Sequence, residues 1–126
     1  MAWYLITAYQ PGTPVSSTVD LVAIVEDLVE EMRTEGAWVF TGHLHPAPSA
    51  ATVVRVTHGE TVTTTGPYLA GNQHMGGCSV VDAPSADEAL RWARKTAAAT
   101  TPPVEVRRFI HDIGHAETQS YPGSAE

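Results

Sequence analysis

Two helix patterns, separated by a long run of strand-like segments, constrain the fold of this chain more than any other feature. Apolar residues recur with the three- and four-residue spacing of an amphipathic helix over residues 18–35, and Gly36 suits its C-terminal end. A second helix is predicted after Ser85, which forms a capping box with Glu88. Its expected apolar stripe consists of Ala89, Leu90, Ala93 and Ala97.

Strand-like segments lie before, between and after the two helices. They cover residues 2–9, 37–45, 51–59, 60–66, 78–83 and 104–111. The third and fourth are expected to form a hairpin that turns at His58–Gly59. This order predicts an α+β fold of the ferredoxin-like βαββαβ type with an extra hairpin strand, in which two helices cover one face of an antiparallel sheet.

The other face of such a sheet would be bare. Dimerisation through that face is the economical way for a small chain to cover it, so we expect a homodimer with a dimeric α/β barrel-like assembly. The length of 126 residues predicts one domain, over residues 1–111, followed by a flexible tail over residues 112–126.

Charge and cysteine content narrow the range of partners and compartments. The net charge of −7, with only seven Lys and Arg, argues against binding to nucleic acid or to an anionic membrane. The single cysteine, Cys78, allows no intrachain disulfide and is expected to be a small core residue. No signal peptide or membrane-length apolar run is apparent, so a cytoplasmic location is predicted. The abundance of Ala, Thr, Val, Gly and Pro suggests a bacterial source.

The stretch TGPYLAGNQHMGG, residues 65–77, is too rich in glycine for a helix. It contains neither of the glycine-rich phosphate-binding motifs, GxxxxGK[ST] and GxGxxG. We interpret it as a wide turn whose backbone lines a pocket, with Gly76 and Gly77 allowing another part of the chain to approach closely.

Five motifs in order carry a resemblance to a known family. They are GHLHP at 42–46, ATVVRV at 51–56, TGPYLAGNQHMGG at 65–77, SADEALRWA at 85–93 and VEVRRF at 104–109. In these motifs the chain resembles the YCII-related domain family, in its DGPF subgroup, which implies a dimeric ferredoxin-like fold. Some members of the family are lyases with a His–Asp pair, whose histidine motif is missing at the matching place here, and others are linked to sigma factors.

The chain departs from the family in the glycine-rich stretch. The family aspartate and phenylalanine are replaced by Thr65 and Tyr68, and its acidic run is replaced by Gly71, Asn72, Gln73 and His74. The resemblance therefore implies a conserved backbone path with a pocket chemistry changed from acidic to neutral and basic.

Strand alternation suggests where the reactive side chains lie. If Leu44, Val54 and Val56 pack under the helices, then His43, His45 and Arg55 point to the open face of the sheet. Histidine transfers protons near neutral pH, and arginine can hold an anionic group. The predicted catalytic residues are His45 and His74. The predicted substrate-binding residues are His43, Arg55, Tyr68, Asn72 and Gln73.

The predicted function is that of a small-molecule enzyme of the lyase or isomerase type, working by general acid–base catalysis in a cleft at the open sheet face. The alternative is a non-catalytic dimer that binds a small ligand or serves as a regulatory or accessory protein, in which these histidines have structural roles. No cofactor is predicted. Three imidazoles, from His43, His45 and His74, could bind zinc, but no zinc motif supports this and no metal is predicted.

Overall fold

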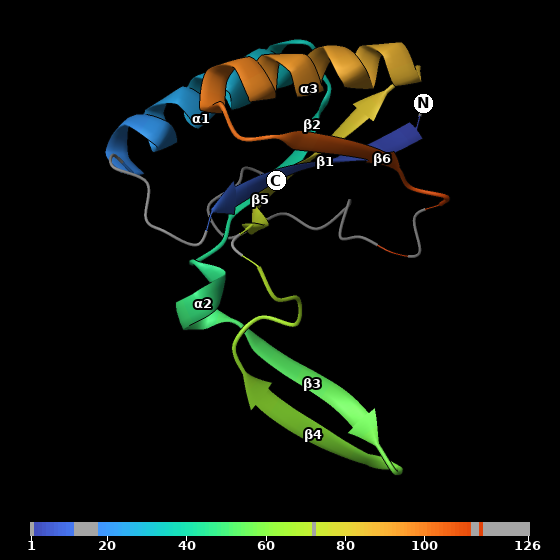
Figure 1. The fold of residues 1–126 in the computed structure, drawn as a ribbon. Helices are drawn as coiled ribbons and strands as arrows, with labels where there is room; N and C mark the ends of the chain where they lie inside the picture. The colour runs from blue at the N-terminus through green and yellow to red at the C-terminus, as the bar shows by residue number, and fades with distance from the viewer. Residues whose placement is uncertain (1, 12–17, 72, 112–113, 115–126) are drawn as a thin grey trace, which may run out of the picture.

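The chain forms an antiparallel sheet with two helices on one side and a hairpin that projects from the other (Figure 1). The structure is a computed structural model and describes residues 2–11, 18–71, 73–111 and 114. Its elements, in order, are β1 (Ala2–Pro11), α1 (Thr18–Thr34), β2 (Trp38–His43), α2 (Ala47–Ala50), β3 (Thr52–Thr57), β4 (Glu60–Thr65), β5 (Gln73–Ala83), α3 (Ala86–Thr100) and β6 (Val104–Arg108).

The main sheet has four strands in the order β2-β5-β1-β6, and every neighbouring pair is antiparallel. The two long helices, α1 and α3, both cover the same face (Figure 1). This strand order and this layering confirm the predicted α+β, ferredoxin-like fold. We call the face away from the helices the open face.

The core lies between the sheet and the two long helices. Alternate residues of β1 and β5, such as Tyr4, Ile6 and Val81, point to the helices and are buried. The helices contribute Met32 and Trp92, which are 0% and 1% exposed. Burying a side chain of this size stabilises the fold by about 1.5–3 kcal/mol.

The predicted stripe of the second helix is partly wrong. Ala89 and Ala93 are buried as expected, but Leu90 is 37% exposed, and Trp92 takes the central place instead. Residues 89, 92 and 93 follow the i, i+3, i+4 rule, so the buried face is rotated by one position relative to the stripe that we predicted.

The predicted helix ends are confirmed. Gly36 has φ +74°, and its amide donates to the Arg33 carbonyl at 3.0 Å, while the Ala37 amide donates to the Met32 carbonyl at 2.8 Å. These two bonds form a Schellman motif, which needs a residue without Cβ strain at Gly36. At the start of α3 the Glu88 amide donates to Ser85 Oγ at 3.2 Å.

The hairpin forms as predicted, and its turn has positive φ at His58 and Gly59 (53° and 81°), as a two-residue hairpin turn requires. Its position was not foreseen. β3 and β4 make a separate two-stranded sheet, so the expectation that Leu44, Val54 and Val56 pack under the helices is wrong. These three side chains are 54%, 64% and 72% exposed.

Two features explain why the hairpin leaves the main sheet. After β2 ends at His43, Pro46 caps the single turn of α2, and Pro46 and Pro48 cannot donate the hydrogen bonds that would continue the strand. β5 starts already at Gln73, inside the predicted wide turn, and occupies the position beside β2. The wide turn is therefore shorter than predicted.

Residues 112, 113 and 115–126 lie outside the described residues, so the predicted tail stays a prediction. Within the described part of the chain, no helix is long and apolar enough to cross a membrane.

Candidate functional site

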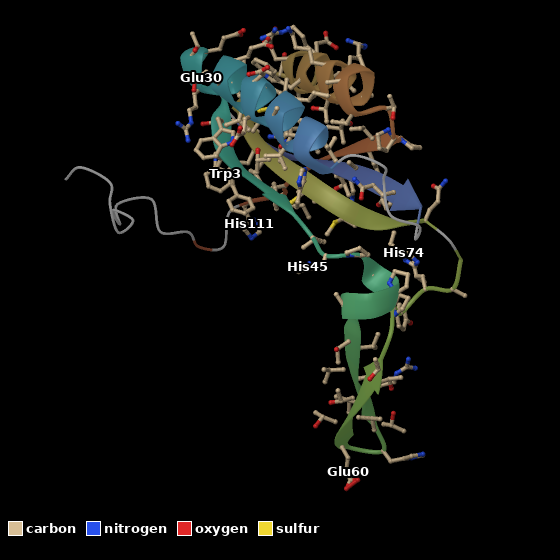
Figure 2. All side chains as sticks on the ribbon, turned by 90° about the vertical axis from the view of Figure 1, so that its left-hand side faces the viewer. Trp3, Glu30, His45, Glu60, His74 and His111 are labelled. Carbon is tan, nitrogen blue, oxygen red and sulfur yellow. The ribbon has the colours of Figure 1, made fainter. Side chains whose placement is uncertain are left out.

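The predicted site residues are spread over the junction between sheet and hairpin and over the hairpin itself. Figure 2 shows His45 and His74 at this junction, each on a different segment of the chain. Arg55 lies in β3, and Tyr68 follows β4. Asn72 lies outside the described residues. We expected one shared cleft because we expected the strands of the hairpin to pack under the helices. The hairpin forms a separate sheet, so this basis for a shared cleft is lost.

Arg55 and Tyr68 form a pair on the hairpin side. The Arg55 guanidinium carbon lies 5.6 Å from the centre of the Tyr68 ring, which is a cation–π contact. The Tyr68 side chain is 70% exposed. Such an exposed contact stabilises by about 0.5–1 kcal/mol. It holds the two side chains together on the surface but does not enclose a pocket.

The two histidines predicted to be catalytic differ in their surroundings. His74 Nε2 lies 3.2 Å from the Gly71 carbonyl oxygen, so this ring helps to close the turn before β5. His45 is exposed, and its ring has no hydrogen-bond partner among the described residues. No group of three or more His, Cys, Asp or Glu side chains in the described ranges could hold a metal ion.

His43 has a different position from the one predicted. A bulge between Trp38 and Phe40 interrupts the alternation of β2. As a result Trp38, Thr41 and His43 all lie on the side of α1, whereas Phe40 lies opposite Val80 on the open face and is 52% exposed. The open-face position predicted for His43 assumed that its neighbour Leu44 packs under the helices. Leu44 is instead 54% exposed, and His43 lies on the helix side, so the prediction for His43 was wrong.

The imidazole of His43 packs on Gly77. A Cβ atom at Gly77 would lie 2.9 Å from His43 Cδ2 and 3.1 Å from the Gly42 carbonyl oxygen. A Cβ atom at Gly76 would lie 2.5 Å from the Gln10 side chain. The close approach predicted for the two glycines is therefore confirmed. The absence of a side chain at Gly77 leaves the space in which the His43 ring lies.

His43 lines two cavities. The first is an open groove of about 460 Å³ between α1 and β2, whose walls include Val25, Val29, Glu26, Glu30, Arg33 and Trp38. The second is smaller and runs beneath α1 to β1 and α3. Both share Val25, Val29, Thr41, Gly42 and His43. The volume of the groove falls in the range of small-molecule sites.

Hydrogen bonds hold the floor of this groove. Trp38 Nε1 donates to Thr41 Oγ1 at 2.9 Å, and Thr41 Oγ1 lies 2.8 Å from Ser79 Oγ. The Arg33 guanidinium carbon lies 4.6 Å from the centre of the Trp38 ring. The groove thus combines an imidazole, a positioned hydroxyl group and an apolar wall, and carboxylates and a guanidinium group also line it.

A run of acidic residues along one side of a helix, such as that of α1, is typical of a solvated surface. Glu26 and Glu30 are indeed exposed, but they also line the groove. No spacing in the sequence signals this, because the groove depends on the bulge in β2. Cys78, by contrast, is half-buried in β5 and is not one of the buried core residues, so the predicted core position is not confirmed. Burial raises the pKa of its thiol.

Comparison with known proteins gives one family. The YCII-related domain matches residues 1–111, which is most of the chain, whereas no curated protein matches significantly. With this match, the fold and the motif order described above place the protein in the YCII-related domain family.

Proposed function

We propose that the protein is a small-molecule enzyme of the lyase or isomerase type, and that His43 transfers the proton in the groove between α1 and β2. The observation that carries this proposal is the position of the His43 imidazole, which is seated on Gly77 at the wall shared by two cavities. We also propose that the chain belongs to the DGPF subgroup of its family, on the basis of the five motifs in order.

The His43 ring is available for chemistry. It has no hydrogen-bond partner among the residues that the structure describes, whereas the His74 ring meets the Gly71 carbonyl. An imidazole titrates near neutral pH and so serves as either base or acid there. The neighbouring Thr41 hydroxyl is held by Trp38 and Ser79 and can orient a polar group of the substrate.

The lining suggests the kind of substrate. Val25 and Val29 provide apolar contact, and Arg33 provides a fixed positive charge. Glu26 and Glu30 line the same groove, so its formal charges do not favour a strongly anionic ligand. A small organic molecule with an apolar part and a polar end fits this set. His43 would remove a proton from carbon next to an electron-withdrawing group. The proton then returns at another carbon in an isomerase, or a leaving group departs in a lyase.

Proton abstraction can be tested before the product is known. Isotope-labelled protein is screened by NMR against a library of small carboxylic acids, phenols and hydroxy acids. The expected hits shift the amide signals of Val25, Val29 and Thr41. Each hit is then incubated with the protein in D₂O, and loss of a carbon-bound proton signal reports abstraction.

A histidine series identifies the proton-transfer residue. His43→Asn should abolish the exchange in D₂O, while His45→Asn should leave it unchanged, since His45 lines neither cavity. Binding in the groove without exchange would support the non-catalytic alternative. Loss of exchange in His45→Asn or His74→Asn, with His43→Asn unaffected, would overturn the assignment to this groove.

A further inference from the structure

Beneath α1 lies the smaller of the two cavities, to which the proposed function assigns no part of the substrate. It has a volume of about 40 Å³. A single water molecule needs about 10–15 Å³ of such space, so the cavity has room for about two or three carbon atoms. Because the cavity and the groove share the lining from Val25 and Val29 to His43, a ligand in the groove can extend into the cavity.

Small residues create this space. On the helix side of the sheet, Ala8 of β1 pairs with Gly77 of β5, and Gly77 pairs with His43 of β2. Apart from the His43 ring, this row has no side chain larger than a methyl group. Farther along the sheet, the large side chains of Tyr4 and Trp92 fill the core. The unfilled volume therefore lies at the end of the core that His43 borders.

The lining of the cavity is apolar and almost without charge. Besides the two valines shared with the groove, its apolar residues are Ile6, Ala8, Leu21, Leu28 and Met32. Of the described residues that line it, His43 alone can become charged near neutral pH. The groove, in contrast, is lined by Glu26, Glu30 and Arg33. A ligand that spans both spaces is thus oriented with its polar end in the groove.

The hydroxyl groups that line the cavity are paired within the protein. Thr96 and Thr100 donate to carbonyls of their own helix, α3, at 2.8 and 2.7 Å. Ser79 Oγ lies 2.8 Å from Thr41 Oγ1. Gln10, at the end of β1, contributes the one side-chain amide of the described lining. Cavities with few free polar groups take up apolar molecules, so this one should hold a hydrocarbon group.

We propose that the cavity is a subsite for the hydrocarbon chain of the substrate, whose polar end lies in the groove beside His43 and Thr41. The substrate class is then a carbonyl compound without a full negative charge, which carries an unbranched chain of about two or three carbon atoms beyond the reacting carbon. This inference rests on the proposed function, because it places the reacting carbon at His43. The binding of the chain itself requires no reaction.

Xenon tests the cavity before any substrate is known, because it binds apolar cavities and has no polar group. Full-length protein with isotope-labelled methyl groups is placed under xenon pressure and followed by NMR. The methyl signals of Ile6, Leu21 and Leu28 should shift, whereas those of Leu90, which does not line the cavity, should stay unchanged. Unchanged signals at all the cavity methyl groups would overturn the proposal.

A homologous series of methyl ketones, from acetone to methyl pentyl ketone, tests the chain length. Each methylene group that enters the cavity should tighten binding about fourfold, and the affinity should level off once the cavity is full. NMR titration of the wild-type protein gives the dissociation constants. An affinity that does not depend on chain length would contradict the assignment of the cavity.

Variants locate the dependence on chain length. Ala8→Leu places its extra carbons in the cavity, so it should remove the fourfold steps and leave the binding of acetone unchanged. The matched control, Ala98→Leu, makes the same change at an exposed residue of α3 and should keep the steps. Leu21→Ala enlarges the cavity, so its affinity should level off at a longer chain. Near-UV circular dichroism checks that each variant is folded. Steps that persist in folded Ala8→Leu would overturn the proposal.

Proton exchange in D₂O separates this proposal from the proposed function. Exchange of the ketone's carbon-bound protons is compared with the rate in buffer without protein. Chain-length steps without faster exchange would support the subsite and count against the enzyme. Faster exchange without chain-length steps would support the enzyme and overturn the subsite.

Discussion

Replacing Gly77 by alanine tests the seat of the His43 imidazole. The new methyl group would lie 2.9 Å from His43 Cδ2 and 3.1 Å from the Gly42 carbonyl oxygen. Both distances are shorter than ordinary van der Waals contact, so the ring must swing away and β2 must shift slightly from β5. Forcing an extra carbon into a packed site costs about 1–3 kcal/mol.

The net cost is smaller than this packing term. Alanine restricts the unfolded chain more than glycine does, and this offsets about 0.4–1 kcal/mol of the packing cost. We therefore expect Gly77→Ala to lower the free energy of unfolding by about 1 kcal/mol, measured by urea denaturation. The displaced ring should also weaken ligand binding in the groove.

A double-mutant cycle separates the ring from the backbone contact. In a His43→Ala background the 2.9 Å contact no longer exists, and only the contact with the Gly42 carbonyl remains. The cost of Gly77→Ala should fall by at least about 0.5 kcal/mol in that background. An equal cost in both backgrounds would refute the reasoning, because it would mean that the ring does not rest on Gly77.

Gly76→Ala is the matched control for this experiment. Its methyl group would meet the end of the Gln10 side chain at 2.5 Å and not a backbone atom. Because a glutamine side chain can move to another rotamer, Gly76→Ala should cost less than Gly77→Ala and should not depend on His43.

Two further predictions concern stability. Trp92→Ala should lower the free energy of unfolding by about 3–5 kcal/mol, because its 1% exposed ring fills the centre of the core, whereas Leu90→Ala on the same helix should cost far less; urea denaturation of both variants gives the comparison. Tyr9 donates a hydrogen bond to the Glu105 carboxylate at 3.0 Å, which raises the pKa of Tyr9 above 10.0. A raised folded-state pKa means that the folded protein keeps the proton to higher pH than the unfolded chain does. This stabilisation is therefore complete below pH 10.0 and is lost as pH rises through the folded pKa. The free energy of unfolding, measured across this range, should fall more steeply in the wild type than in Tyr9→Phe.

The features that could be predicted from the sequence are those that depend on near neighbours. The end of α1 at Gly36, the cap at Ser85 and the turn at His58–Gly59 were all predicted and are all confirmed. Each depends on backbone conformation or on a hydrogen bond within a few residues. The close approach at Gly76 and Gly77 was also predicted, but not its partner, since the partner lies on a different strand.

The candidate site could not be predicted in the same way. His43 was assigned to the open face because it alternates with Leu44, which was expected to pack under the helices and is instead 54% exposed. A bulge before Phe40 also puts Trp38 on the same side as His43, against simple alternation. A bulge has no reliable signal in spacing, because it depends on how two distant strands align. The same holds for Glu30, which reads as a solvated helix residue until β2 is placed beside α1 to form the groove.

The sequence by itself determined the order and kinds of the long elements, though not the short α2, and with them the α+β class and the pairing of β3 with β4. These follow from periodicities of two and about 3.6 residues and from local turn chemistry. Only the tertiary structure decided that the hairpin of β3 and β4 leaves the main sheet, that Trp92 and not Leu90 fills the core, and that His43 lies beside α1. The physical reason is that strand registry and helix rotation are settled by packing between residues far apart in the chain, which alternation and spacing along one segment do not encode.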